Sequence, residues 1–189
     1  MEPVEKPSYM NDAVRYGALF GIAASVLSLA LTYLYLGSEP DGAMFTPMSM
    51  VGIVVCLLGA MTGLLTVRTV AKTTGLPMKA GQGAVIGLVA GALFTVFSGV
   101  ISVVWTQLVD PSLTDRMMEH MIANFEAMAN LPAESKEQMI DAVAAEFEKQ
   151  KTFMGQLAAL GLNGLFNVVL NVFTGMIGVA VFAKKEEVL

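Results

Sequence analysis

Long apolar runs separated by short polar segments set the pattern of this chain. Four runs contain no Asp, Glu, Lys, Arg or His, and they cover residues 16–36, 47–67, 80–109 and 152–183. A helix of about 20 apolar residues crosses the hydrocarbon core of a bilayer. The pattern therefore predicts an all-α integral membrane protein in which four spanning helices form a four-helix bundle, with residues 1–189 as a single membrane domain.

The polar segment between the third and fourth runs, residues 110–151, has a helical pattern of its own. Asp110 before Pro111, or Ser112 one residue later, can start a helix. An apolar stripe with helical spacing follows at Met117, Met118, Met121, Ile122, Phe125 and Met128. Residues 130–132 (Asn-Leu-Pro) interrupt it, and a second stripe runs into the fourth span. We expect an amphipathic helical hairpin whose apolar faces bury each other, lie on the lipid surface or receive a partner.

Charge placement predicts the orientation of the chain. Hydrophobic residues make up 55% of the chain and charged residues 14%, against about 25% charged residues in a soluble domain. Basic residues favour the cytoplasmic side of a membrane. They flank the spans at Lys6, Arg15, Arg68, Lys72, Lys79, Lys184 and Lys185. The short first connection instead carries Glu39 and Asp41. We therefore expect a multi-pass protein of the bacterial inner membrane, with both termini cytoplasmic and the hairpin extracytoplasmic.

Small residues recur at four-residue intervals within the spans. The longest such series begins with Gly83, Gly87 and Gly91 in the third span. Shorter series include Gly17 and Gly21 in the first span and Gly59 and Gly63 in the second. Small side chains let helix backbones approach closely in a membrane. This spacing predicts a glycine zipper, formed either within the chain or with a second copy of it.

Three asparagines form a polar column on the fourth span. Asn163, Asn167 and Asn171 fit within an arc of about 80° on a helix. An amide without partners in hydrocarbon costs several kcal/mol, so these side chains must face protein or water. We expect them to face the serines of the third span, such as Ser98 and Ser102, or those of the first. They either hold the bundle together by hydrogen bonds or line a cavity for a small solute or a lipid headgroup.

Few residues suggest catalytic or metal chemistry. Met117, His120 and Met121 offer the soft ligands that suit Cu(I), but both methionines serve equally well as apolar filler. This makes them a weak candidate, and we expect neither a metal nor a cofactor. No nucleophile–base pair is evident, and the spans carry no ionisable carrier for protons. The sequence predicts a protein that is not an enzyme, and its net charge of −5 argues against a nucleic-acid partner.

The chain resembles the bacterial membrane proteins catalogued as domain of unknown function 4199. The resemblance rests on the small-residue spans, the Asp110-Pro111 exit from the third span, the insertion with its KEQM at residues 136–139, and the last span ending in Lys184-Lys185. It extends from about Tyr16 to Lys185 and implies a four-span inner-membrane protein. It supplies no activity and no site residues.

Two functions fit these features. The first is a structural or accessory membrane protein whose hairpin is an interaction module. Its partners would be membrane lipids and another membrane or periplasmic protein, or a second copy of the chain. The alternative is a small oligomeric transporter or channel-like protein with a polar path lined by asparagine and serine.

Overall fold

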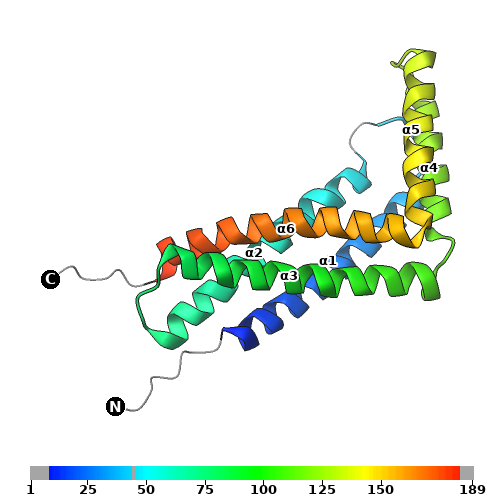
Figure 1. Ribbon diagram of the computed structural model, residues 1–189. Coiled ribbons are helices and arrows are strands. Elements are labelled where there is room, and N and C mark those ends of the chain that lie inside the picture. Colours follow the sequence, from blue (N-terminus) through cyan, green and yellow to red (C-terminus); the bar gives the residue numbers. More distant parts are fainter. Residues whose placement is uncertain (1–8, 44–45, 184–189) are drawn as a thin grey trace, which may run out of the picture.

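The computed structural model describes residues 9–43 and 46–183, and its regular elements are helices (Figure 1). They are α1 (Met10–Leu36), α2 (Pro47–Thr74), α3 (Ala80–Val104), the π-helical turn η1 (Trp105–Val109), α4 (Leu113–Ala127), α5 (Ala133–Lys151) and α6 (Phe153–Phe182). Lys6, Lys184 and Lys185 lie outside the described residues.

Four of these helices are long and apolar enough to cross a membrane, which confirms the all-α, four-span fold class. The candidate spans are Met10–Leu36, Ser49–Thr74, Ala80–Val109 and Met154–Phe182. The second helix runs beyond the expected end at residue 67 and includes Arg68 and Lys72. The charged residues end the apolar run, but they do not end the helix. Their long side chains can extend toward the lipid headgroups.

The four spanning helices are arranged so that α1 and α6 each pack against both α2 and α3. In Figure 1 the described ends of the chain lie at one end of the bundle, and α4 and α5 lie at the other. We call these the terminal end and the hairpin end. Helices α1 and α3 run toward the hairpin end, and α2 and α6 return from it.

The closest contact in the bundle joins α3 and α6. A Cβ atom added at Gly87 would lie 2.0 Å from the backbone oxygen of Asn171, and one added at Gly83 would lie 2.5 Å from that of Gly175. Gly91 faces the same residue, with its added Cβ atom 2.8 Å from Cβ of Asn171. The backbones of α3 and α6 therefore touch along a face where a side chain larger than that of glycine would clash.

The remaining glycines that the sequence singled out lie at two other contacts within the chain. Gly17 and Gly21 of α1 lie against α3, where added Cβ atoms would meet Leu93 at 2.7 Å and Phe97 at 2.9 Å. Gly59 and Gly63 of α2 lie against α6, and their contacts with its asparagines are described below.

Apolar side chains pack together toward the terminal end. Val67, Val70, Ile86 and Val179 form a buried apolar cluster there. Nearby Thr62 is fully buried, and its hydroxyl donates to the backbone oxygen of Leu58 in its own helix at 3.1 Å. The half of the bundle next to the hairpin contains the cavity described below.

The hairpin of α4 and α5 lies across the end of the bundle rather than along it (Figure 1). The two helices pack against each other, and α5 has no buried residue within the described chain. The expectation that the second stripe would run on into the fourth span is wrong. Thr152 is extended, with ψ 145°, and its hydroxyl accepts the N–H of Gly155 at 3.0 Å. The chain changes direction there, so α6 needs its own N-terminal cap.

Replacing Gly87 by alanine should destabilise the bundle. The new methyl group would meet the backbone of α6, which cannot move aside as a flexible side chain would. Such overpacking costs about 1–3 kcal/mol. We expect Gly87→Ala to lower the melting temperature of the detergent-solubilised protein.

Gly81→Ala is the matched control, because an added Cβ atom there meets nothing within 4 Å. Equal melting temperatures for Gly87→Ala, Gly81→Ala and the wild type would contradict the close contact between α3 and α6.

Candidate functional site

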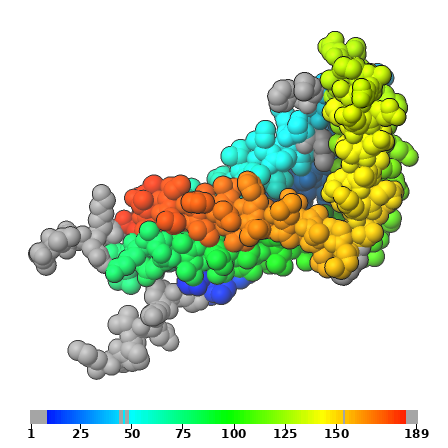
Figure 2. All heavy atoms as spheres, turned by 45° about the horizontal axis from the view of Figure 1, so that its top comes forward, coloured from blue at the N-terminus to red at the C-terminus, as the bar shows by residue number. Residues whose placement is uncertain are grey.

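An open cavity of about 370 Å³, lined by apolar and uncharged polar side chains, lies between all four spanning helices in the half of the bundle next to the hairpin. Figure 2 shows the space-filled surface hollowed between α2, α6 and the hairpin, with part of α1 at the bottom of the hollow. The polar side chains that line the cavity are those of Ser25, Ser28, Cys56, Thr95, Ser98, Ser102, Asn163 and Asn167. No Asp, Glu, Lys, Arg or His is among its lining residues.

The cavity exists because α2 and α6 separate toward the hairpin end. At Gly59 an added Cβ atom would lie 2.6 Å from Oδ1 of Asn167, whereas at Gly52 it would meet nothing within 4 Å. Both Gly52 and Phe94 line the cavity. Phe94 is only 1% exposed, so its ring closes the inner end.

The asparagine column divides into residues with different surroundings. Asn171 is fully buried below the cavity. Its Oδ1 accepts the backbone N–H of Gly63 at 2.7 Å, and its Nδ2 donates to the backbone oxygen of Asn167 at 2.8 Å. The partner on the neighbouring helix is therefore the backbone of α2, and not a serine of the first or third span. Glycine makes this possible because no side chain covers its N–H group.

Asn167 forms part of the cavity wall and is not fully satisfied. Its Nδ2 donates to the backbone oxygen of Asn163 at 3.0 Å. Its Oδ1 is buried, and among the described residues it has no hydrogen-bond partner. Gly59 lies beside this oxygen. An orphaned buried amide oxygen costs on the order of 1–3 kcal/mol, so it would gain from a hydrogen-bond donor in the cavity.

Two of the serine hydroxyls offer only acceptor lone pairs to the cavity. Ser25 donates its hydroxyl proton to the backbone oxygen of Gly21 at 2.8 Å, and Ser98 donates to that of Thr95 at 3.2 Å. Each hydroxyl oxygen can still accept a hydrogen bond. The structure thus brings Ser98, Ser102, Asn163 and Asn167 together around one cavity, whereas Asn171 lies beneath it.

A smaller polar compartment continues the cavity toward the hairpin. It measures about 200 Å³ and shares Ser102, Leu160 and Asn163 with the larger cavity. Gln150 of α5 and Gln156 of α6 also line it. The hairpin therefore contributes directly to the wall of the polar region.

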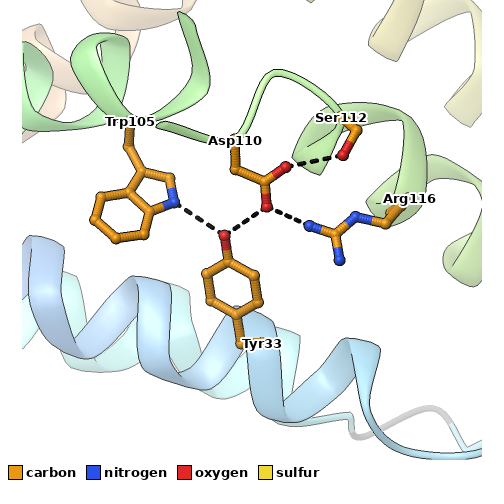
Figure 3. A network of polar contacts seen from close by, with 5 residues as sticks. All are labelled: Tyr33, Trp105, Asp110, Ser112 and Arg116. Atoms are coloured by element: carbon orange, nitrogen blue, oxygen red, sulfur yellow. Dashed lines mark hydrogen bonds and ion pairs between the residues drawn. The ribbon is translucent and has the colours of Figure 1, made fainter. Parts of the chain in front are cut away.

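The hairpin is fixed to the bundle by a network around Asp110 (Figure 3). Tyr33 of α1 donates to the Asp110 carboxylate at 2.6 Å and accepts the indole N–H of Trp105 at 3.0 Å. Ser112 donates to the other carboxylate oxygen at 2.8 Å, and Arg116 of α4 forms an ion pair with Asp110. The aromatic residues near the span ends and the Asp-Pro exit were visible in the sequence, but their convergence was not.

Hydrogen bonds set the acidity of the Asp110 carboxyl group. Those from Tyr33 and Ser112, together with the charge of Arg116, hold the pKa of Asp110 below its ordinary value, although partial burial works in the opposite direction. The Arg116 guanidinium also lies 5.7 Å from the centre of the Tyr33 ring. The ionised carboxylate is therefore the form that joins α1, η1 and α4.

A second anchor joins α4 to the connection between α1 and α2. His120 donates its Nε2–H to the backbone oxygen of Ser38 at 2.8 Å. Asn124 is 5% exposed. Its amide accepts the N–H of Gly42 at 3.0 Å and donates to the backbone oxygen of Ala43 at 3.2 Å. Gly42 has φ +70°, a conformation that favours glycine.

The weak metal candidate lies at this second anchor. The His120 ring packs edge-on against Tyr35, with ring centroids 4.3 Å apart. Met121 lines a pocket of about 250 Å³ together with Met128, and Met117 is half-buried. Among the described residues, no group of three or more His, Cys, Asp or Glu side chains could hold a metal ion.

The family model described as "Protein of unknown function (DUF4199)" matches residues 15–185, and the chain belongs to this family. No curated protein and no solved structure matches the chain.

The Asp110 network should make the attachment of the hairpin pH-dependent. A carboxyl group whose pKa is lowered in the folded protein stabilises the fold above its ordinary pKa, and this contribution is lost as the pH falls through the folded value. We expect protection of α4 amides from hydrogen exchange to decrease as the pH is lowered below about 4.

Asp110→Asn should reduce this protection at neutral pH and flatten its dependence on pH. Glu119→Gln is the control, because Glu119 is exposed on α4 and lies outside the network. Identical pH profiles for Asp110→Asn and the wild type would contradict the role of Asp110.

Proposed function

We propose that this member of the DUF4199 family is a non-enzymatic accessory protein of a bacterial inner membrane, with the α4–α5 hairpin as its interaction module. The observation that carries the proposal is the attachment of α4 at two separate points, through Asp110 and through His120 with Asn124. A hairpin held at two points keeps a fixed position relative to the membrane. A fixed surface loses less entropy on binding than a mobile one.

The second helix of the hairpin supplies the surface that a partner would contact. Helix α5 has no buried residue within the described chain, and its acidic side chains are exposed. These are Glu134, Glu137, Asp141, Glu146 and Glu148. Its apolar side chains Ile140, Val143 and Phe147 are only half-buried. An exposed helix that is polar on one side and partly apolar on the other can bind a second protein.

The proposed orientation has both termini in the cytoplasm and the hairpin on the opposite side of the membrane. Arg15, Arg68 and Lys72 lie in the terminal-end parts of α1 and α2, whereas Glu39 and Asp41 lie at the hairpin end. Basic residues in short segments favour the cytoplasmic side. A partner of the hairpin would then be periplasmic, another membrane protein, or a second copy of this chain.

Cysteine labelling can test orientation and partner binding together. In a Cys56→Ser background, Asp141→Cys places a thiol on exposed α5 and Leu76→Cys places one at the terminal end. A membrane-impermeant maleimide added to spheroplasts, in which only the outer membrane is removed, should label Asp141→Cys and leave Leu76→Cys unlabelled. Asp141→Cys should also react several-fold more slowly in native membranes than in purified nanodiscs, because a partner covers it.

Glu39→Cys is the control for general shielding by the membrane, since it is exposed at the same end of the bundle. Its reaction rate should be similar in both preparations. Equal rates at Asp141→Cys in native membranes and nanodiscs would rule out a partner on α5, and labelling of Leu76→Cys in sealed spheroplasts would reverse the orientation.

The cavity favours a second candidate function, a small oligomeric transporter for an uncharged solute. Its polar wall contains Asn163, Asn167 and Ser102 and carries no charge. Passage would require α2 and α6 to separate at Gly63 and Asn171, where they are joined by a hydrogen bond of 2.7 Å.

Glycerol-induced swelling of proteoliposomes tests this second function. If solute passes along the asparagines, Asn167→Leu should abolish swelling while the protein stays folded, because the polar wall is interrupted. Asn130→Leu, an exposed position between α4 and α5, is the matched control. Wild-type vesicles that swell no faster than empty ones would exclude glycerol as the solute.

A further inference from the structure

We propose that the cavity between the four spans binds an uncharged lipid through a free hydroxyl group, as in a diacylglycerol. This site is distinct from the hairpin surface and does not depend on the function proposed for it. Three properties of the cavity carry the inference: its hydrogen-bonding character, its location within the spans, and the chemistry of its walls.

The hydrogen-bonding groups of the wall favour an uncharged hydroxyl group. The Asn167 Oδ1 lacks a partner among the described residues, and Ser25 and Ser98 have already donated their protons to backbone oxygens. Gly59 lies against the Asn167 oxygen, so the side-chain amide must rotate before this oxygen can reach a ligand in the cavity. A hydroxyl group supplies the missing proton. A charged headgroup would find no ion-pair partner among the lining residues.

The location selects a ligand that arrives from the membrane. The lining residues of α6 extend from Leu160 to Asn167, which is about 10–20 Å along the helix from its start. The hydrocarbon core is about 30 Å thick, so the cavity lies within it. Its hollow lies on the side of the bundle between α2 and α6 (Figure 2). Phe166, which is 59% exposed, lines the cavity on this side.

The remaining walls fit an acyl chain. Leu29, Val51, Val55, Ile101 and Leu160 supply an apolar part of the cavity wall. Small-molecule cavities of about 300–1,000 Å³ combine largely apolar walls with a few polar groups that orient the ligand. A lipid alcohol would place its hydroxyl group near Asn167 and the first part of its chain between α2 and α6. Phe94 and Asn171 block further passage, so the geometry favours a bound lipid over a translocated solute.

Photo-crosslinking of the full chain in phosphatidylcholine nanodiscs tests the proposal. The probe is a diacylglycerol with a diazirine near the start of one acyl chain. Mass spectrometry should locate its adducts on α2 and α6 beside the cavity. Asn167→Leu, which removes the amide oxygen, should lower this labelling about three- to tenfold, the effect of losing about one hydrogen bond.

Filling the cavity gives a variant that does not disturb its walls. Gly52 lines the cavity and an added Cβ atom meets nothing within 4 Å, so Gly52→Leu should occupy the space and reduce adducts to background. Gly161→Leu is the matched control. Gly161 also lies in a span, its added Cβ atom meets nothing within 4 Å, and it is not among the lining residues. This control should label as strongly as the wild type.

A phosphatidic acid with the same diazirine chain tests the headgroup. We expect its adducts in the cavity to be several-fold fewer than those of the diacylglycerol, because the phosphate is charged. Equal labelling by both lipids would overturn the proposed selectivity. Diacylglycerol adducts that are absent from the cavity, or unchanged in Gly52→Leu, would overturn the lipid site and leave water as its occupant. Neither result bears on labelling of the hairpin at Asp141→Cys.

Discussion

The contact between Asn171 and the glycines around it is the constraint on which the bundle depends. Three backbones converge there, because Gly63 donates its N–H to the Asn171 amide while Gly87 and Gly91 admit Asn171 against α3. Helices in lipid gain little from apolar burial, so close packing and hydrogen bonds must hold them together. Both occur at this one residue, and the position of α6 against α2 and α3 follows from it.

Close packing of α2 and α6 at one point along the bundle allows them to separate at another. Because α2 and α6 are joined at Gly63 and Asn171, α2 can lean away toward the hairpin end without dissociating from the bundle. The space that this leaves is bordered by the less constrained members of the asparagine column, Asn163 and Asn167. The asparagine column thus packs against the neighbouring helices at Asn171, and it forms a polar wall at Asn163 and Asn167.

The sequence alone was sufficient for the four spans, because length and lack of charge decide whether a helix can cross a bilayer. The surroundings of individual polar residues could not be predicted. A column with regular spacing says which side of α6 is polar, but not that Asn171 would meet the backbone of α2. The Asp110 network joins residues 77 positions apart, and the turn at Thr152 depends on the hairpin lying across the bundle. Both follow from tertiary geometry rather than from local pattern.

At the π-helical turn η1, the number of residues in the chain matters as much as which residues they are. Each residue of a helix turns the following segment by about 100°, and π-helical turns commonly mark one inserted residue at a functional position. The widened turn at Trp105–Val109 presents Trp105 and Asp110 to the same tyrosine, Tyr33. A chain one residue shorter here would keep every side chain of the network and yet point the hairpin in another direction. The spacing between Trp105 and Asp110 is thus a structural feature in its own right.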